Sequence, residues 1–282
     1  MSTLQHLNRI DLAIDRYIRK LSRRNEPLEY YRTQREYKAF RTQFKTAITK
    51  QMSDIADELN NTKDNRLTGP DGATYTKHHL LQKFVPISNY IDKNNVVKYY
   101  KSVYNYTVKT AYQRNGVIAK GDFTFNITNK NIIAQLGDQA NSLLDLSSLD
   151  STTQDQLWNI ISTGIDDGLT PYEIADTIQA NIGGISDYRA NMIADTETAN
   201  IMGNANLDFM TNNGVEYKQW VTAGDNPCDE CQSNEDAGEI PVDENFPTGD
   251  DSEPAHPNCE CYVDAVQMDL TDVPDSELWS GN

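Results

Sequence analysis

Apolar residues in the first half of the chain recur at the spacing of amphipathic helices. In residues 4–21, 28–59 and 88–115 they return every three or four positions, which places them on one face of a helix. A short break at Asn25-Glu26-Pro27 separates the first two segments, so we predict a helical hairpin followed by a long tyrosine-rich helix. The residues expected to be buried in the second and third helices are Phe40, Phe44, Ile48, Met52, Ile55, Leu59, Val96, Tyr100, Tyr104, Val108 and Ala111.

The middle of the chain is predicted to be one strand followed by helices. Residues 123–128 alternate between apolar and polar side chains, which indicates a strand. Residues 132–146 and 151–167 have helical spacing, and Gly168 follows as the expected end of the second helix.

A strong helix start follows at Thr170-Pro171-Tyr172-Glu173. Thr170 can cap the helix, proline suits the first helical position, and Glu173 completes a capping box. We expect this helix to end near Gly183-Gly184 and Ser186 to cap another one, which reaches Asn213-Gly214.

The periodicity then changes to two, which predicts strands at residues 215–221, 239–242 and 259–266. The expected fold class is therefore mainly α with a small β component. We predict an N-terminal helical region over residues 1–120, an α+β domain over residues 121–270, and a polar tail over residues 271–282.

Every cysteine of the chain lies between residues 228 and 261. Cys228 and Cys231 have the Cys-x2-Cys spacing, so a tight turn can aim both sulfurs at one point. Cys259 and Cys261 are two residues apart and would leave the same face of a strand, and His256 stands just before them. We call Cys228 and Cys231 the first clip, and Cys259 and Cys261 the second clip. Two such pairs of ligands separated by a loop are typical of a structural zinc site.

Five candidate ligands exceed the four that a structural zinc ion takes. Either the four cysteines bind and His256 supports them from outside, or His256 replaces Cys259 or Cys261. Disulfides between the same pairs and a cysteine nucleophile partnered by His256 are the alternatives. Because the chain lacks other catalytic signatures, such as His-Glu-x-x-His or Gly-x-Ser-x-Gly, we expect a non-enzymatic protein.

The net charge of −17 is unevenly distributed. Residues 1–66 contain 14 Lys and Arg against 9 Asp and Glu, whereas residues 201–282 contain Lys218 alone against 19 acidic residues. An acidic chain repels DNA, so contact with DNA is expected only through the basic N-terminal helices. The chain has no apolar run that could span a bilayer and no signal-peptide core at residues 1–6, so we expect synthesis in a cytoplasm and no membrane contact.

Three segments of the chain resemble the phage Mu F-like head morphogenesis domain, found in minor head proteins of tailed bacteriophages. They are Gly168–Ala175, Arg189–Glu197, and the cysteine-containing segment from Lys218 to Cys261. The closing His-Pro-Asn-Cys-x-Cys run at residues 256–261 is the most specific part. The resemblance covers about residues 150–266. Asp195 and Glu260 depart from it, because the family often has Arg at both positions.

The resemblance implies a minor head protein of the virion, assembled in the host cytoplasm and associated with the portal protein. The major capsid protein and a scaffolding protein are further candidate partners, and the implied roles are head assembly, DNA packaging or DNA ejection. A zinc-ribbon-like nucleic-acid-binding protein is the alternative, but it would need basic residues around the metal. An enzyme appended to a head domain would need a catalytic constellation that the sequence does not contain.

Overall fold

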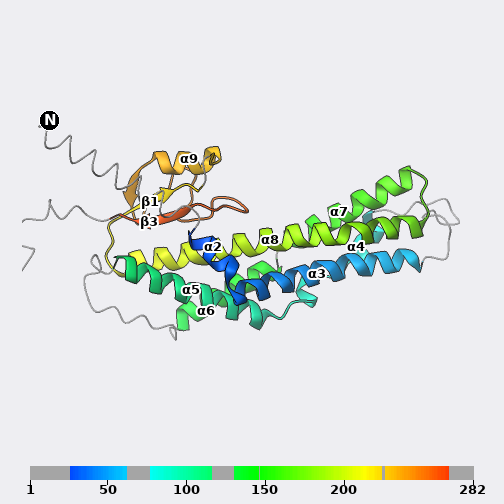
Figure 1. The fold of residues 1–282 in the computed structure, drawn as a ribbon, viewed down its shortest axis with the longest axis horizontal. Coiled ribbons are helices and arrows are strands. Elements are labelled where there is room, and N and C mark those ends of the chain that lie inside the picture. The colour runs from blue at the N-terminus through cyan, green and yellow to red at the C-terminus, as the bar shows by residue number, and fades with distance from the viewer. Residues whose placement is uncertain (1–25, 62–76, 116–129, 146, 224–225, 267–282) are drawn as a thin grey trace, which may run out of the picture. The chain divides into compact units, whose positions relative to one another are not determined.

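The computed structural model describes residues 26–61, 77–115, 130–145, 147–223 and 226–266. These residues form helices and one small antiparallel sheet, as predicted (Figure 1). The predicted helix at 4–21, the strand at 123–128 and the tail at 271–282 lie outside them. The helices are α2 Glu26–Thr33, α3 Arg35–Asn60, α4 Lys77–Lys83, η1 Ile87–Asn89, α5 Lys93–Asn115, α6 Lys130–Asp145, α7 Ser147–Asp166, α8 Pro171–Asn212 and α9 Asp229–Asp236, and the strands are β1 Tyr217–Val221, β2 Glu239–Pro241 and β3 Tyr262–Ala265.

The chain forms two compact units, and each unit is built from segments that are not consecutive in the sequence. We call residues 33–102 and 127–194 the helical unit, and residues 1–32, 103–126 and 195–282 the sheet unit. Helices α5 and α8 therefore contribute residues to both units. The boundaries predicted at residues 120 and 270 lie outside the described residues and stay a prediction. No helix among the described residues is long and apolar enough to cross a membrane.

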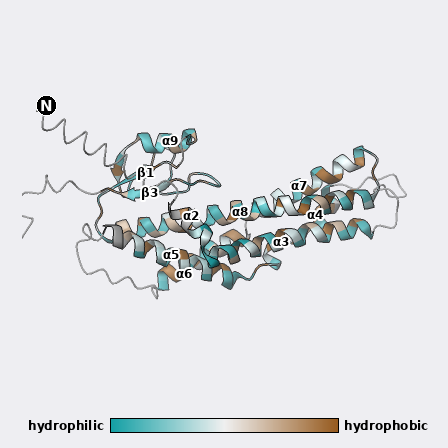
Figure 2. Cartoon of the chain, viewed as in Figure 1, coloured by the Kyte–Doolittle hydropathy of each residue, from teal (hydrophilic) through white to brown (hydrophobic). Residues whose placement is uncertain are grey.

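The helical unit buries the apolar face of α3 that the sequence predicted. Figure 2 shows the alternation of apolar and polar residues along its helices. The ring of Phe40 stacks on Tyr99 of α5 with centroids 4.3 Å apart, a contact that contributes about 1 kcal/mol beyond its buried area. All eleven core positions named above are buried: Phe40, Phe44, Ile48, Met52, Ile55, Leu59, Val96, Tyr100, Tyr104, Val108 and Ala111.

The single helix predicted over residues 28–59 is wrong, because the chain breaks between α2 and α3. Gln34 has an extended backbone, with φ −72° and ψ 149°. Glutamine does not itself break helices. Tertiary contacts of α2 accompany the change of direction, since the Tyr31 hydroxyl donates a hydrogen bond to the carbonyl oxygen of Val103 at 3.1 Å. Contacts between residues so far apart in sequence cannot be seen from local periodicity.

Helix α8 begins as predicted but does not end as predicted. The capping box is present, with the backbone N–H of Thr170 donating to the Glu173 carboxylate at 2.8 Å. The helix then continues through Gly183 and Gly184 to Asn212, so the predicted break and the Ser186 cap are wrong. The Ser186 hydroxyl instead bonds back to the Gly183 carbonyl at 3.3 Å. Buried apolar residues on both sides of the glycine pair explain this, because packing overrides a propensity cost of about 1 kcal/mol per glycine.

The sheet has the order β2-β1-β3, and both pairs are antiparallel. All three predicted strands are present, but the third begins at Tyr262, so Cys259 and Cys261 precede it. Trp220 of β1 is fully buried and meets the ring of Phe246 edge-on, with centroids 5.2 Å apart. These residues belong to one core cluster with Cys231, Cys259 and Cys261.

Lys218 of β1 fixes the acidic loop that precedes the second cysteine clip. It is fully buried, and its Nζ donates a hydrogen bond to the backbone carbonyl of Asp251 at 2.8 Å. The ammonium also lies 5.4 Å from the centre of the Phe246 ring. Burial lowers the pKa of Lys218. The buried ammonium group of Lys218 therefore anchors the loop through its backbone carbonyl at Asp251.

Candidate metal centre

The first clip is built on the start of α9, a helix that the sequence analysis did not predict. Cys228 is the N-cap residue, and its sulfur accepts a hydrogen bond from the backbone N–H of Cys231 at 3.4 Å. Asp229 and Glu230 occupy the first turn, where carboxylates favour the helix dipole. These two acids after a capping position were the available signal for the helix. The turn brings the two sulfurs of the clip together.

The second clip lies in the loop that leads into β3. Asn258 has a φ of 60°, a left-handed conformation that asparagine tolerates better than most residues. The backbone N–H of Cys259 donates to the carbonyl of His256 at 3.2 Å, which closes a tight turn. The sulfur of Cys261 accepts a hydrogen bond from the backbone N–H of Ala223 at 3.4 Å. Both clips are thus positioned by backbone geometry.

The fold brings all five candidate ligands together. Nε2 of His256 is 3.2 Å from the sulfur of Cys228 and 3.3 Å from that of Cys231, and the sulfurs of Cys231 and Cys259 are 3.6 Å apart. Ligand atoms on the edges of a zinc tetrahedron are separated by roughly 3.5–3.8 Å, given bonds of about 2.0–2.3 Å. The donor set therefore fits zinc, and metal binding stays a prediction.

Cys231 belongs to two groups of candidate ligands. Within each group, the ligand atoms all lie within 4.8 Å of one another. One group also holds Cys228 and His256, and the other holds Cys259 and Cys261. A metal ion would have to draw ligands from both groups to reach four. The two ligand sets predicted from the sequence, with four cysteines or with His256 replacing one, both remain open.

The ring of His256 is oriented for coordination. Its Nδ1 lies 3.0 Å from the carbonyl oxygen of Pro257, which can only accept, so Nδ1 carries the proton. Nε2 then presents its lone pair to the sulfurs of Cys228 and Cys231. A backbone carbonyl that fixes the tautomer in this way is typical of histidines that bind metals. The same hydrogen bond is the main reason why the pKa of His256 is raised.

Hydrogen bonds favour the thiolate form at Cys228 and Cys261, whereas hydrogen bonds to neighbouring thiols raise the pKa of Cys231. The backbone N–H of Cys231 lowers the pKa of Cys228. Hydrogen bonds from the other buried thiols, Cys231 first, lower the pKa of Cys261. Thiolates are the form of cysteine that binds zinc. All four cysteines are free thiols, and Cys231 lies beside both His256 and Cys228, an arrangement more typical of a metal site than of one nucleophile.

Glu253 is a buried carboxyl group beside the second clip. It accepts hydrogen bonds from the backbone N–H of Val263 at 2.9 Å and from the hydroxyl of Ser252 at 3.2 Å. Burial is the main cause of its pKa being raised to about 7. The folded state therefore binds a proton at Glu253 more tightly than the unfolded chain, whose glutamates titrate at about 4.3.

Replacing Glu253 with glutamine should weaken the pH dependence of stability. Because the folded pKa is raised, the contribution of Glu253 is most favourable below pH 4.5 and is lost as the pH rises through 7. We expect Glu253→Gln to be more stable than the unmodified chain at pH 8, by up to about 3 kcal/mol, and to lose that advantage at pH 5. Urea denaturation at both pH values measures the difference. Equal effects at pH 5 and pH 8 would contradict the shifted titration.

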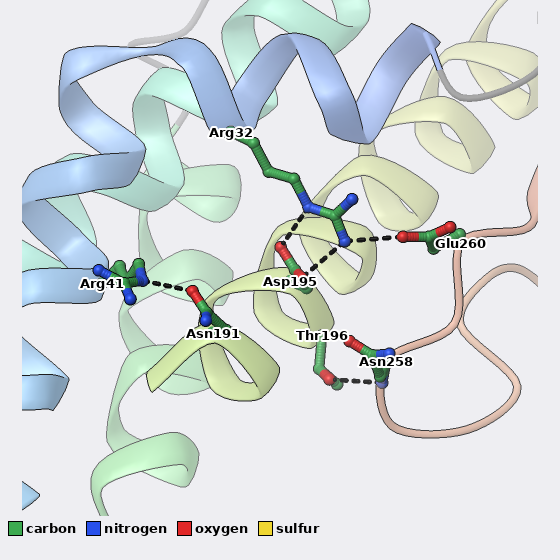
Figure 3. Close-up of polar contacts among 7 residues, drawn as sticks. All are labelled: Arg32, Arg41, Asn191, Asp195, Thr196, Asn258 and Glu260. Atoms are coloured by element: carbon green, nitrogen blue, oxygen red, sulfur yellow. Dashed lines mark hydrogen bonds and ion pairs between the residues drawn. The ribbon is translucent and has the colours of Figure 1, made fainter. Parts of the chain in front are cut away.

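Two residues of α8 hold the second clip from outside the ligand set. Asn258 donates its backbone N–H to the hydroxyl oxygen of Thr196 at 2.9 Å (Figure 3). Asp195 binds the guanidinium of Arg32, which also reaches Glu260 between Cys259 and Cys261. The sequence analysis did not find Arg32, because its partners are 163 and 228 positions away.

Comparison with known families agrees with the resemblance predicted from the sequence. Residues 155–264 match the family described as phage Mu protein F like protein. The matched range contains all of α8, β1 and β2, most of β3, and the five candidate ligands. This match identifies residues 155–264 as similar to that phage family. Searches of curated proteins and of solved structures gave no match.

Proposed function

We propose that the chain is a minor head protein of a tailed bacteriophage. In this proposal it is a non-enzymatic component of the virion that binds the portal protein and takes part in head assembly, DNA packaging or DNA ejection. The observation that carries the proposal is the family match over residues 155–264, which encloses the complete cysteine and histidine cluster. The cluster then serves as a structural zinc site that orders the loop between its two clips.

A structural role for the metal follows from the number of donors. Catalytic zinc needs an open position for water or substrate, whereas a structural site uses four protein ligands. Five donors on two clips can close the coordination sphere without a vacancy. The segment between the clips is acidic and exposes Asp243, Glu244 and Asp251, while Val242 and Phe246 within it are buried in the core of the sheet unit. In our proposal a metal ion adds to the stabilisation that these two residues provide.

Nucleic-acid binding by the metal centre is disfavoured by the charges around it. Lys218 is the sole cation among residues 201–282, and it is fully buried. The exposed residues on α9 beside the first clip include Asp229 and Glu230. A nucleic-acid-binding surface needs clustered Lys and Arg. DNA contact, if it occurs, is assigned in our proposal to the basic residues of the N-terminal segment.

Association with purified portal oligomers tests the proposal. The full chain is mixed with portal protein from the same phage, and co-sedimentation is measured with the major capsid and scaffolding proteins in parallel. We expect saturable binding to the portal. A matched variant with Arg9, Arg16, Arg19, Lys20, Arg23 and Arg24 changed to Gln tests the contribution of the basic segment while keeping every described helix. A zinc-loaded chain that binds none of the three proteins would refute the proposed partners.

A further inference from the structure

Arg32 connects the N-terminal helix α2 to the second cysteine clip through one guanidinium group. Nε and Nη2 donate to the two oxygens of the Asp195 carboxylate at 3.1 and 2.7 Å. Nη2 also donates to Oε1 of Glu260 at 2.7 Å (Figure 3). Glu260 stands between the candidate ligands Cys259 and Cys261. A single side chain therefore joins α2, α8 and the clip within the sheet unit.

The contact with Asp195 is the stronger of the two. The Asp195 side chain is 6% exposed, whereas that of Glu260 is 40% exposed. An exposed ion pair contributes little, but a two-pronged arginine–carboxylate pair with a buried acid is well ordered and shielded from solvent. Without Arg32, the buried carboxylate would lose both of these hydrogen bonds and would face another acid at residue 260. Arg32 thus separates two like charges as well as binding each of them.

The same clip has a second attachment one residue further along α8. Thr196 accepts the backbone N–H of Asn258, and Asn258 precedes Cys259. Residues 258 and 260, on either side of Cys259, are therefore tied to neighbouring positions of one helix. This arrangement fixes where the sulfur of Cys259 lies, which is 3.6 Å from that of Cys231. Loss of the Asn258–Thr196 hydrogen bond or of the Arg32–Glu260 ion pair would leave the second clip attached to α8 on one side of Cys259 only.

We propose that Arg32 is a positioning residue of the metal centre and that metal binding and the docking of α2 stabilise each other. The inference rests on metal binding at the proposed centre. Groups that orient metal ligands from outside change affinity by roughly 10- to 100-fold when they are removed. Because coupling between two binding events is reciprocal, an ion that orders the clip must also strengthen the Arg32 contact that holds α2.

Zinc titration of the full chain against a chromogenic chelator tests the proposal. Arg32→Met is expected to weaken zinc binding by roughly 10- to 100-fold. Arg32→Lys keeps the charge but cannot bridge both acids with a rigid fork, so it should bind with intermediate affinity. The matched control is Arg41→Met, which breaks an ion pair with Asp187 at 2.8 Å and a contact with Asn191 in the helical unit. It should leave zinc affinity unchanged.

A charge exchange and a measurement without mutation complete the test. Glu260→Arg introduced into Arg32→Glu should restore part of the affinity that Arg32→Glu loses. Removing zinc from the unmodified chain should speed hydrogen exchange of the α2 amides. If the unmodified chain binds zinc and the folded Arg32→Met and Arg32→Lys variants bind it equally well, the positioning role is wrong. If the unmodified chain binds no zinc, the metal centre and the role of Arg32 are both wrong.

Discussion

Replacing Cys231 with serine is expected to abolish metal binding and to unfold the sheet unit around the cysteine clips. Cys231 is buried and belongs to both groups of ligand atoms, so its loss breaks both at once. Structural zinc sites contribute on the order of 10 kcal/mol to the folding of the segments they join. Elemental analysis should show about one zinc per chain in the unmodified protein and almost none in Cys231→Ser. Limited proteolysis should cut the variant between residues 223 and 262.

The other ligand candidates provide the graded comparison. Cys228→Ser, Cys259→Ser, Cys261→Ser and His256→Ala each remove a member of one group only. The variant that keeps full zinc affinity identifies the donor that does not coordinate, which decides between the two ligand sets. Ser233→Ala, an exposed position on α9, is the control and should change nothing. An unmodified chain without zinc, whose four thiols all react freely, would contradict the metal centre.

Gly203→Ala should destabilise the sheet unit by about 2–3 kcal/mol, although alanine usually strengthens a helix. A Cβ atom at residue 203 of α8 would overlap the backbone carbonyl oxygen of Glu253 and the hydroxyl of Ser252. The serine side chain can rotate, but the backbone oxygen cannot move without displacing the segment that leads to the second clip. Urea denaturation followed by circular dichroism measures the change, and the zinc affinity of the variant should fall as well.

The same substitution elsewhere on α8 should have the opposite effect. Gly183 has no atom within 4 Å of a Cβ position, so Gly183→Ala adds helix propensity without a clash. We expect it to stabilise the protein by about 1 kcal/mol. The pair is a matched test, because both changes add one methyl group to one helix. If both variants were stabilised, the close approach at Gly203 would be wrong.

Periodicity predicted the buried faces better than the ends of the elements. The apolar stripe of α3 was correct at every position, because burial of such a face is what gives most helices their stability. The capping box at Thr170 and Glu173 was correct for the same local reason, since all of its atoms lie within four residues. Spacing also predicted that the five candidate ligands come together, and the fold places them together, whereas their binding to a metal ion stays a prediction.

The features that the sequence analysis missed depend on distant contacts. The extended residue Gln34 and the continuous path through Gly183 are set by packing that local propensity does not record. Helix α9 lies in a segment that resembled an acidic loop, and its available signal was the pair of acidic residues, Asp229 and Glu230, in its first turn. Arg32 offered no local signal, since a charged residue on a short helix is usually exposed. Its position beside Asp195 and Glu260 is visible only in three dimensions.

The interleaving of the two units has a consequence for what counts as a domain in this protein. The family match spans residues 155–264, but it begins inside the helical unit and lacks residues that complete the sheet unit. Ala111 of α5 belongs to the core beneath the sheet, and Arg32 binds beside the second clip. We therefore expect residues 155–264 expressed alone to be less stable than the full chain, because they lack Ala111 in the core of the sheet unit and Arg32 beside the second clip.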